Sequence, residues 1–140
     1  MDDVSEKHRK INMNRVIKFK AKGLDDGDWK EGNLVVTDLI GCDGPITEII
    51  TTDEMRYKVD PSTICQFTGL KDRDGKEIWE GDIVIRYSDQ GDITAYVVWE
   101  NESCRYTLVN IRNKYYTINS LRYDTLKVIG NRYDECDILS

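Results

Sequence analysis

Short runs of β-branched and aromatic residues, separated by short polar turns, fill the second half of this chain. They restrict its possible folds more than any other feature. The runs occupy residues 83–87, 93–99, 105–111 and 115–118. The turns between them are Gln90-Gly91, Asn101-Glu102-Ser103 and Asn113-Lys114. Val, Ile, Tyr and Trp favour strands, and such short turns join antiparallel neighbours. The spacing therefore predicts a meander.

The residues after the meander suggest how its sheet is completed. We expect a short helical turn at residues 119–124 and a last strand at Leu126-Lys127-Val128-Ile129, just before Gly130. Meandering strands, one helical turn and a further strand follow the element order of an SH3-like barrel, and closure would cover the sheet edges. The expected fold is therefore mainly β, with a small SH3-like β-barrel in the C-terminal half.

The first half predicts a β-hairpin. Ile17, Phe19 and Ala21 alternate with lysines, which is the period of a half-buried strand. A second strand starts at Trp29 and continues through residues 34–36. The Asp26-Gly27 pair between the two strands suits a tight turn, because glycine tolerates positive φ.

Domain organisation follows from where these patterns stop. Residues 1–12 are polar without an amphipathic stripe, and we expect a flexible tail there. Residues 37–63 are interrupted by glycines and prolines and predict an irregular lobe. We expect residues 13–140 to form a single domain, with the hairpin and the lobe in residues 13–63 and the barrel-like part in residues 64–140.

Charge and composition exclude some classes of protein. The formal net charge of −6 weakens the expectation of non-specific nucleic-acid binding. No apolar run is long enough for a membrane span, and the N-terminus lacks a signal-peptide core, so we expect a cytoplasmic protein that does not bind membranes. The four cysteines are widely spaced and predict reduced, small core residues: Cys42, Cys65, Cys104 and Cys136.

Catalytic and metal-binding patterns are missing. His8 is the only histidine and lies in the expected tail, so a histidine-dependent triad or metal site cannot form in the folded body. Asp72, Asp74 and Glu77 lack the spacing of an EF-hand loop. We therefore expect no catalytic residue, no metal, no cofactor and no enzymatic activity.

Several motifs in the C-terminal two-thirds are distinctive. They are Gln66-Phe67-Thr68-Gly69-Leu70-Lys71-Asp72, Gly75-Lys76-Glu77-Ile78, Glu80-Gly81-Asp82-Ile83-Val84 and Val128-Ile129-Gly130-Asn131-Arg132-Tyr133-Asp134. With these motifs and the start at residues 15–21, the chain resembles the YopX family of phage and prophage proteins from residue 13 to about residue 140. The tract at residues 66–84 is the most specific part. Phe67, where the family often has Tyr, and Cys136, where it often has Pro, depart from the pattern.

The resemblance implies a small β-rich protein encoded by a bacteriophage or an integrated prophage, typically of Gram-positive bacteria. It implies no established activity and no catalytic residues. Only a structural motif can be transferred from the family to this chain. It comprises Gln66, Thr68, Gly69, Gly81 and Asp82. In the Glu80-Gly81-Asp82 turn we expect Gly81 to adopt a backbone conformation that other residues resist, and Asp82 to accept backbone N–H bonds at a strand entrance.

The leading functional interpretation is a noncatalytic module that associates with itself or with a host or phage protein, because the predicted strands could pair at their edges. The alternative is a nucleic-acid-binding protein with a basic and aromatic barrel face. Its contact surface would comprise Arg105, Arg112, Lys114, Tyr115 and Tyr116, and it requires the three cations to cluster. A third interpretation, an acidic mimic of DNA, is disfavoured by the 20 basic residues.

Overall fold

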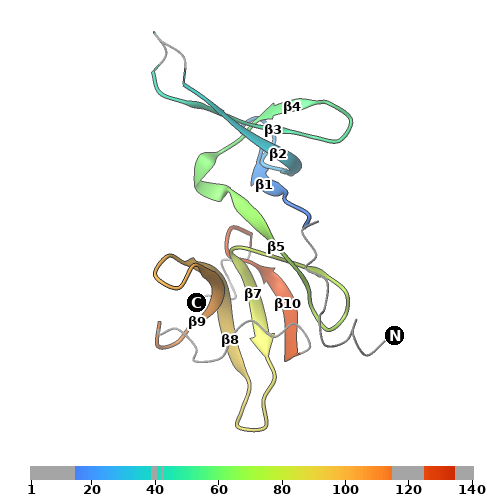
Figure 1. The fold of residues 1–140 in the computed structure, drawn as a ribbon, viewed down its shortest axis with the longest axis vertical. Coiled ribbons are helices and arrows are strands. Elements are labelled where there is room, and N and C mark those ends of the chain that lie inside the picture. Colours follow the sequence, from blue (N-terminus) through green and yellow to red (C-terminus); the bar gives the residue numbers. More distant parts are fainter. Residues whose placement is uncertain (1–14, 39–40, 42, 115–124, 135–140) are drawn as a thin grey trace, which may run out of the picture.

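Two antiparallel sheets form the protein, as Figure 1 shows in a computed structural model that describes residues 15–38, 41, 43–114 and 125–134. The first sheet has the strand order β4-β3-β2-β1-β5-β6 and the second has the order β10-β7-β8-β9. The mainly β class predicted from the sequence is confirmed. No helix within the described ranges is long and apolar enough to cross a membrane.

The first sheet begins with the predicted hairpin. β1 (Phe19–Lys22) pairs with β2 (Trp29–Thr37) in an antiparallel register that places Lys22 opposite Trp29. Gly27 in the connecting turn has φ of +72°, a conformation that glycine adopts without a steric penalty. The expected hairpin is therefore present.

The predicted irregular lobe is wrong, because this region continues the first sheet. β3 (Ile46–Ile50) pairs with β2, and β4 (Arg56–Lys58) pairs with β3. The chain then returns to the end of β1 through a bridge between Gly23 and Val59. Strands of five and three residues carry too little alternation to be recognised between glycines and prolines.

The hydrophobic core of the first sheet lies where the chain returns from β4 to the end of β1. Ala21, Ile49 and Val59 are fully or almost fully buried, and residues of neighbouring segments pack against them. A short 3-10 helix, η1 (Pro61–Thr63), then leads from this core into β5 (Cys65–Lys71).

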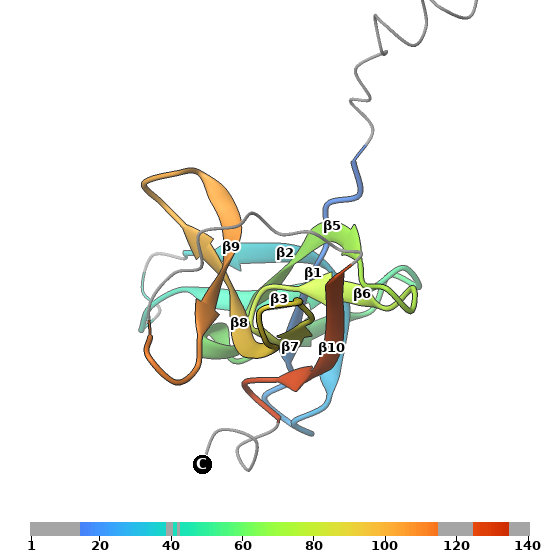
Figure 2. The same cartoon turned by 90° about the horizontal axis from the view of Figure 1, so that it is seen from below.

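The hairpin of β5 and β6 (Glu77–Trp79) joins the two sheets. β5 pairs with β1 in the first sheet. Ile78 and Leu70, however, pack into the core of the second sheet, and Figure 2 shows β6 beside β10. The tract of residues 66–84 therefore holds the molecule together.

The second sheet contains the predicted meander. β7 (Asp82–Arg86), β8 (Ile93–Glu100) and β9 (Arg105–Asn110) are antiparallel neighbours, and β10 (Leu126–Asn131) pairs with β7. The strand expected at residues 115–118 and the helical turn expected at residues 119–124 lie outside the described residues.

Strand pairing does not close a barrel within the described part of the chain. The order of the second sheet ends at β10 and β9, and the β5–β6 hairpin pairs with β1 of the first sheet. The two sheets share a packed core through this hairpin instead of one continuous ladder. The SH3-like closure stays a prediction.

Candidate binding pocket between the two sheets

The basic residues predicted to form a contact surface do not lie together. Arg105 opens β9 and forms an ion pair with Glu100 at 3.6 Å. Arg112 and Lys114 lie beyond the other end of this six-residue strand, roughly 17 Å along an extended chain. Lys114 Nζ is 5.6 Å from the centre of the Tyr96 ring. Tyr115 and Tyr116 are outside the described residues.

The predicted structural motif lies at the junction of the sheets. Thr68 Oγ1 donates a hydrogen bond to the Ile78 carbonyl at 2.7 Å, which fastens the β5–β6 hairpin, and Gly69 follows with φ of +89°. Gly81 has φ of +86°, and its N–H donates to the Val97 carbonyl of β8 at 2.7 Å. These contacts fix the β5–β6 hairpin against the second sheet.

Asp82 is the centre of a buried polar network at this junction. It is 3% exposed, and its carboxylate accepts hydrogen bonds from the Trp79 N–H at 2.8 Å and from Asn131 Nδ2 at 3.1 Å. Burial raises the pKa of Asp82, although both hydrogen bonds act in the opposite direction. The network explains why an acid follows Gly81, because Asp82 at the start of β7 accepts the buried backbone N–H of Trp79 at the end of β6.

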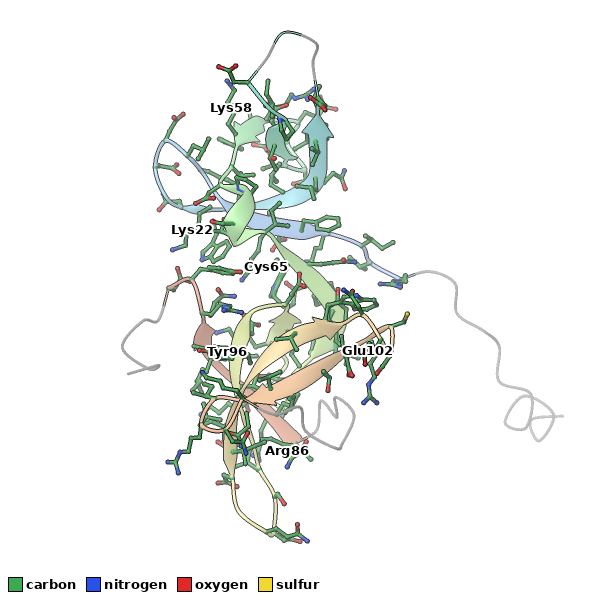
Figure 3. All side chains as sticks on the ribbon, turned by 90° about the vertical axis from the view of Figure 1, so that its left-hand side faces the viewer. Lys22, Lys58, Cys65, Arg86, Tyr96 and Glu102 are labelled. Carbon is green, nitrogen blue, oxygen red and sulfur yellow. The ribbon has the colours of Figure 1, made fainter. Side chains whose placement is uncertain are left out.

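Cys65 lies beside this network, and Figure 3 shows it between the two sheets. Burial raises the pKa of its thiol to about 12, so the nucleophilic thiolate is not populated at neutral pH. Cys104 does not follow the expectation of a core residue, because it is exposed in the β8–β9 turn with φ of +52°. Cys42 and Cys136 lie outside the described residues.

Lysines and aromatic rings of the first sheet also meet at the junction. Lys20 Nζ lies 4.7 Å from the centre of the Trp29 ring and 4.9 Å from that of Trp79. Lys18 Nζ lies 4.9 Å from the Phe67 ring and forms an ion pair with Glu77 at 2.7 Å. Cation–π contacts of this kind stabilise the packing of β1 on the β5–β6 hairpin.

A pocket of about 400 Å³ opens on the same junction. Its lining residues come from five segments of the chain: Arg15 before β1, Gln66 on β5, Glu80 before β7, Trp99 on β8 and Tyr106 on β9. Figure 3 shows why both sheets contribute, because the β8–β9 turn, marked by Glu102, lies at the end of the second sheet that faces the first.

Two aromatic side chains form one wall of the pocket. Trp99 and Tyr106 are directly opposite each other in the β8–β9 register, and their ring centres are 5.1 Å apart in an edge-to-face arrangement. Trp99 is 43% exposed. A large exposed aromatic residue that is held by a second ring is typical of a binding surface.

Glu80 supplies fixed negative charge to the pocket. Its Oε1 accepts the Gln66 N–H at 3.2 Å, and its own N–H donates to the Gln66 carbonyl at 2.9 Å. Among the described residues Glu80 forms no ion pair within 4.0 Å. Burial raises the pKa of Tyr106, and the Glu80 charge raises it further while Arg15 lowers it.

A second pocket, of about 460 Å³, lies on the first sheet but is lined by charges that neutralise one another. Lys30 pairs with Asp26 at 2.7 Å, and Arg56 pairs with Glu48 at 2.9 Å. The acidic turn at residues 25–28 is thus partly neutralised by the chain itself. Within the described ranges no three His, Cys, Asp or Glu side chains are placed to hold a metal ion.

Sequence reasoning did not identify the junction pocket, although part of its signal is present. Trp99 and Tyr106 are equidistant from the centre of the Asn101-Glu102-Ser103-Cys104 turn, so a hairpin places them side by side on one face. Arg15 and Glu80 reach the same place only because the β5–β6 hairpin pairs with β1, and no local pattern reveals this pairing.

The fold and the pocket define a two-sheet β protein with an aromatic and charged pocket at the sheet junction. The family model described as YopX protein matches residues 18–140, and the chain therefore belongs to the YopX family. Among solved structures, the chain is similar to the crystal structure of protein EF1440 from Enterococcus faecalis, with 19% identity and a TM-score of 0.49. The match covers 91% of this chain and 100% of that chain. No curated protein matches the sequence.

Proposed function

We propose that this chain is a noncatalytic binding module that receives part of another protein in the junction pocket. The observation that carries this proposal is the exposed ring of Trp99, held edge-to-face by Tyr106 in a pocket that the anchored carboxylate of Glu80 also lines. Trp and Tyr are enriched among the residues that contribute most to protein–protein affinity, because they bury a large area and lose little conformational entropy.

The surroundings of the pocket support recognition by a preformed surface. Gln66 and Glu80 are joined by two hydrogen bonds, and Gly81 and Asp82 are fixed to β8 and to Trp79 directly behind them. A partner that binds such a site does not have to order it first, which favours affinity. The specific motif of the family thus forms the support of the pocket.

The chemistry of the lining also supports a binding role. Among the described residues that line the pocket, Glu80 is the one carboxylate, and none is a histidine or a cysteine. General acid–base and nucleophilic catalysis rely on a second group that exchanges a proton with the first.

As part of this proposal, the module is a phage or prophage accessory protein in the cytoplasm of the host cell. Its partner is a host protein, a phage protein or a second copy of the chain. The resemblance in the motif tract supports the phage origin. Nucleic-acid binding through Arg15 and the two rings is the competing function, and the experiment below distinguishes the two.

The test is affinity capture from phage-bearing cells at physiological salt with tagged wild type, Trp99→Ala and Val36→Ala. Val36 is a matched control, because it is also exposed, at 57%, but lies on the first sheet. We expect one protein to be recovered in stoichiometric amount with wild type and with Val36→Ala, to survive nuclease, and to be lost with Trp99→Ala. Recovery that disappears with nuclease would support nucleic-acid binding instead.

A further inference from the structure

We infer that the junction pocket recognises a cationic side chain, an arginine of the partner protein, stacked on Trp99 and paired with Glu80. This inference rests on the proposed function and specifies its ligand. Three features of the pocket carry it: an aromatic face over which no described Lys or Arg lies, an anchored carboxylate with no ion pair among the described residues, and the position of Arg15.

The aromatic wall attracts cations. A guanidinium or ammonium group is attracted to the negative face of an aromatic ring, most strongly to that of Trp. Elsewhere at the junction the chain uses this interaction repeatedly, as when Lys20 lies 4.7 Å from the Trp29 ring. Within the described part of the chain, no Lys or Arg lies over the ring of Trp99.

Glu80 supplies the charge that such a cation needs. One carboxylate oxygen is held by the Gln66 N–H, which fixes the orientation of the group, and no ion pair neutralises it among the residues described. Neighbouring acids differ, because Glu77 is paired with Lys18 and Glu100 with Arg105. The planar guanidinium can stack on a ring and donate to a carboxylate at the same time, which favours arginine over lysine.

The position of Arg15 makes it possible to test the sign of the ligand's charge. It lines the same pocket but is exposed, whereas Glu80 is half-buried and held by the backbone of β5. A cationic ligand gains from Glu80 and is repelled by Arg15, and an anionic ligand such as a phosphate or a carboxylate shows the reverse. The net charge of −6 also favours approach of a cation.

The experiment titrates the ¹⁵N-labelled chain with acetylated and amidated pentapeptides Gly-Gly-X-Gly-Gly, in which X is Arg, Lys, Gln or Glu. The indole N–H signal of Trp99, assigned with Trp99→Phe, reports binding. We expect saturable shifts with the Arg peptide at millimolar concentration, weaker binding of the Lys peptide, and no binding of the Gln and Glu peptides. Glu80→Gln should weaken binding by about tenfold, and Arg15→Ala should leave it unchanged or strengthen it.

Glu102→Gln is the matched control, because it removes one negative charge from the exposed β8–β9 turn outside the pocket lining. The inference is overturned if Glu102→Gln weakens binding as much as Glu80→Gln, if the Glu peptide binds in place of the Arg peptide, or if no peptide shifts Trp99. Trp99-dependent capture of a protein that binds Glu80→Gln as well as wild type would overturn the inference and leave the proposed function standing. Binding of oligothymidylate with no peptide binding would overturn both.

Discussion

Asp72 Oδ2 accepts the backbone N–H of Val128 at 2.8 Å and thereby ties the β5–β6 turn to β10 across 56 residues of chain. Its other oxygen accepts the N–H groups of Asp74 and Lys76, both at 2.9 Å. Burial alone would raise the pKa of Asp72, but these three backbone donors lower it below its usual value. One side chain thus satisfies three donors and fastens the hairpin of the first sheet to an edge of the second.

Replacement of Asp72 by alanine should lower the free energy of unfolding by about 2–3 kcal/mol, because the buried donor of Val128 loses its acceptor. Urea denaturation followed by tryptophan fluorescence measures the change. Asp74→Ala is the control, because Asp74 is exposed on the same turn and should cost less than about 0.5 kcal/mol. Equal effects of the two substitutions would show that the Asp72 contacts do not stabilise the fold.

The pKa of Asp72 is lowered on folding, so its contribution to stability is lost as the pH falls, whereas the raised pKa of Asp82 predicts a contribution that is lost as the pH rises. Because burial raises its pKa in the folded chain, the stability linked to protonated Asp82 is fully present below the unfolded pKa of about 3.9 and is lost as the pH rises through the folded pKa. The unfolding free energy of wild type minus that of Asp82→Asn should therefore fall across this window and stay constant above it. Urea unfolding of both proteins at a series of pH values provides the test, and a difference that rises with pH would contradict the burial of Asp82.

The two described cysteines should differ in reactivity. In a Cys42→Ser, Cys136→Ser background, the exposed Cys104 should react with a thiol reagent at about pH 8, and Cys65 should react only after unfolding, because burial raises its pKa to about 12. Ellman's reagent, used with and without urea, counts the reactive thiols. Rapid labelling of Cys65 in the folded Cys104→Ser variant would contradict its position at the junction.

Gly32 should not tolerate a side chain, because a Cβ atom at this position would overlap the backbone oxygen of Ile50 on β3. Gly32→Ala should therefore destabilise the chain by about 1–3 kcal/mol, since either strand must shift to relieve the overlap. Asn33→Ala, at the next and exposed position of β2, is the control and should be nearly neutral. Thermal unfolding by circular dichroism compares them, and an unchanged melting temperature of Gly32→Ala would contradict the β2–β3 pairing.

Local patterns predicted the strands that have one polar face or a clear turn on either side. The lysines that alternate with Phe19 and Ala21 predicted β1, and the turn at residues 101–103 separated β8 from β9. Leu70 and Ile78 could not be assigned to a core from their own neighbours. They lie on a hairpin whose backbone pairs with the first sheet, while these two side chains pack into the core of the second.

Prediction of the pocket from the sequence required the same long-range information. The sequence singled out Arg105, Arg112 and Lys114 because they are close along the chain, but β9 separates the first from the other two. Glu80 and Trp99 are 19 positions apart and line the same pocket because Gly81 donates to Val97 on β8. Contacts of this kind depend on strand register, which a single sequence specifies only indirectly.

The affinity of the captured partner protein for Trp99→Ala, measured by isothermal titration calorimetry, tests the central claim most directly. Circular dichroism first verifies that Trp99→Ala and Val36→Ala are folded like wild type. We predict that Trp99→Ala binds at least about tenfold more weakly, because a central aromatic residue of an interface contributes more than about 1.4 kcal/mol, and that Val36→Ala binds like wild type. Equal affinities of wild type and Trp99→Ala, or the absence of any protein partner, would contradict the assignment of the junction pocket as a protein-binding site.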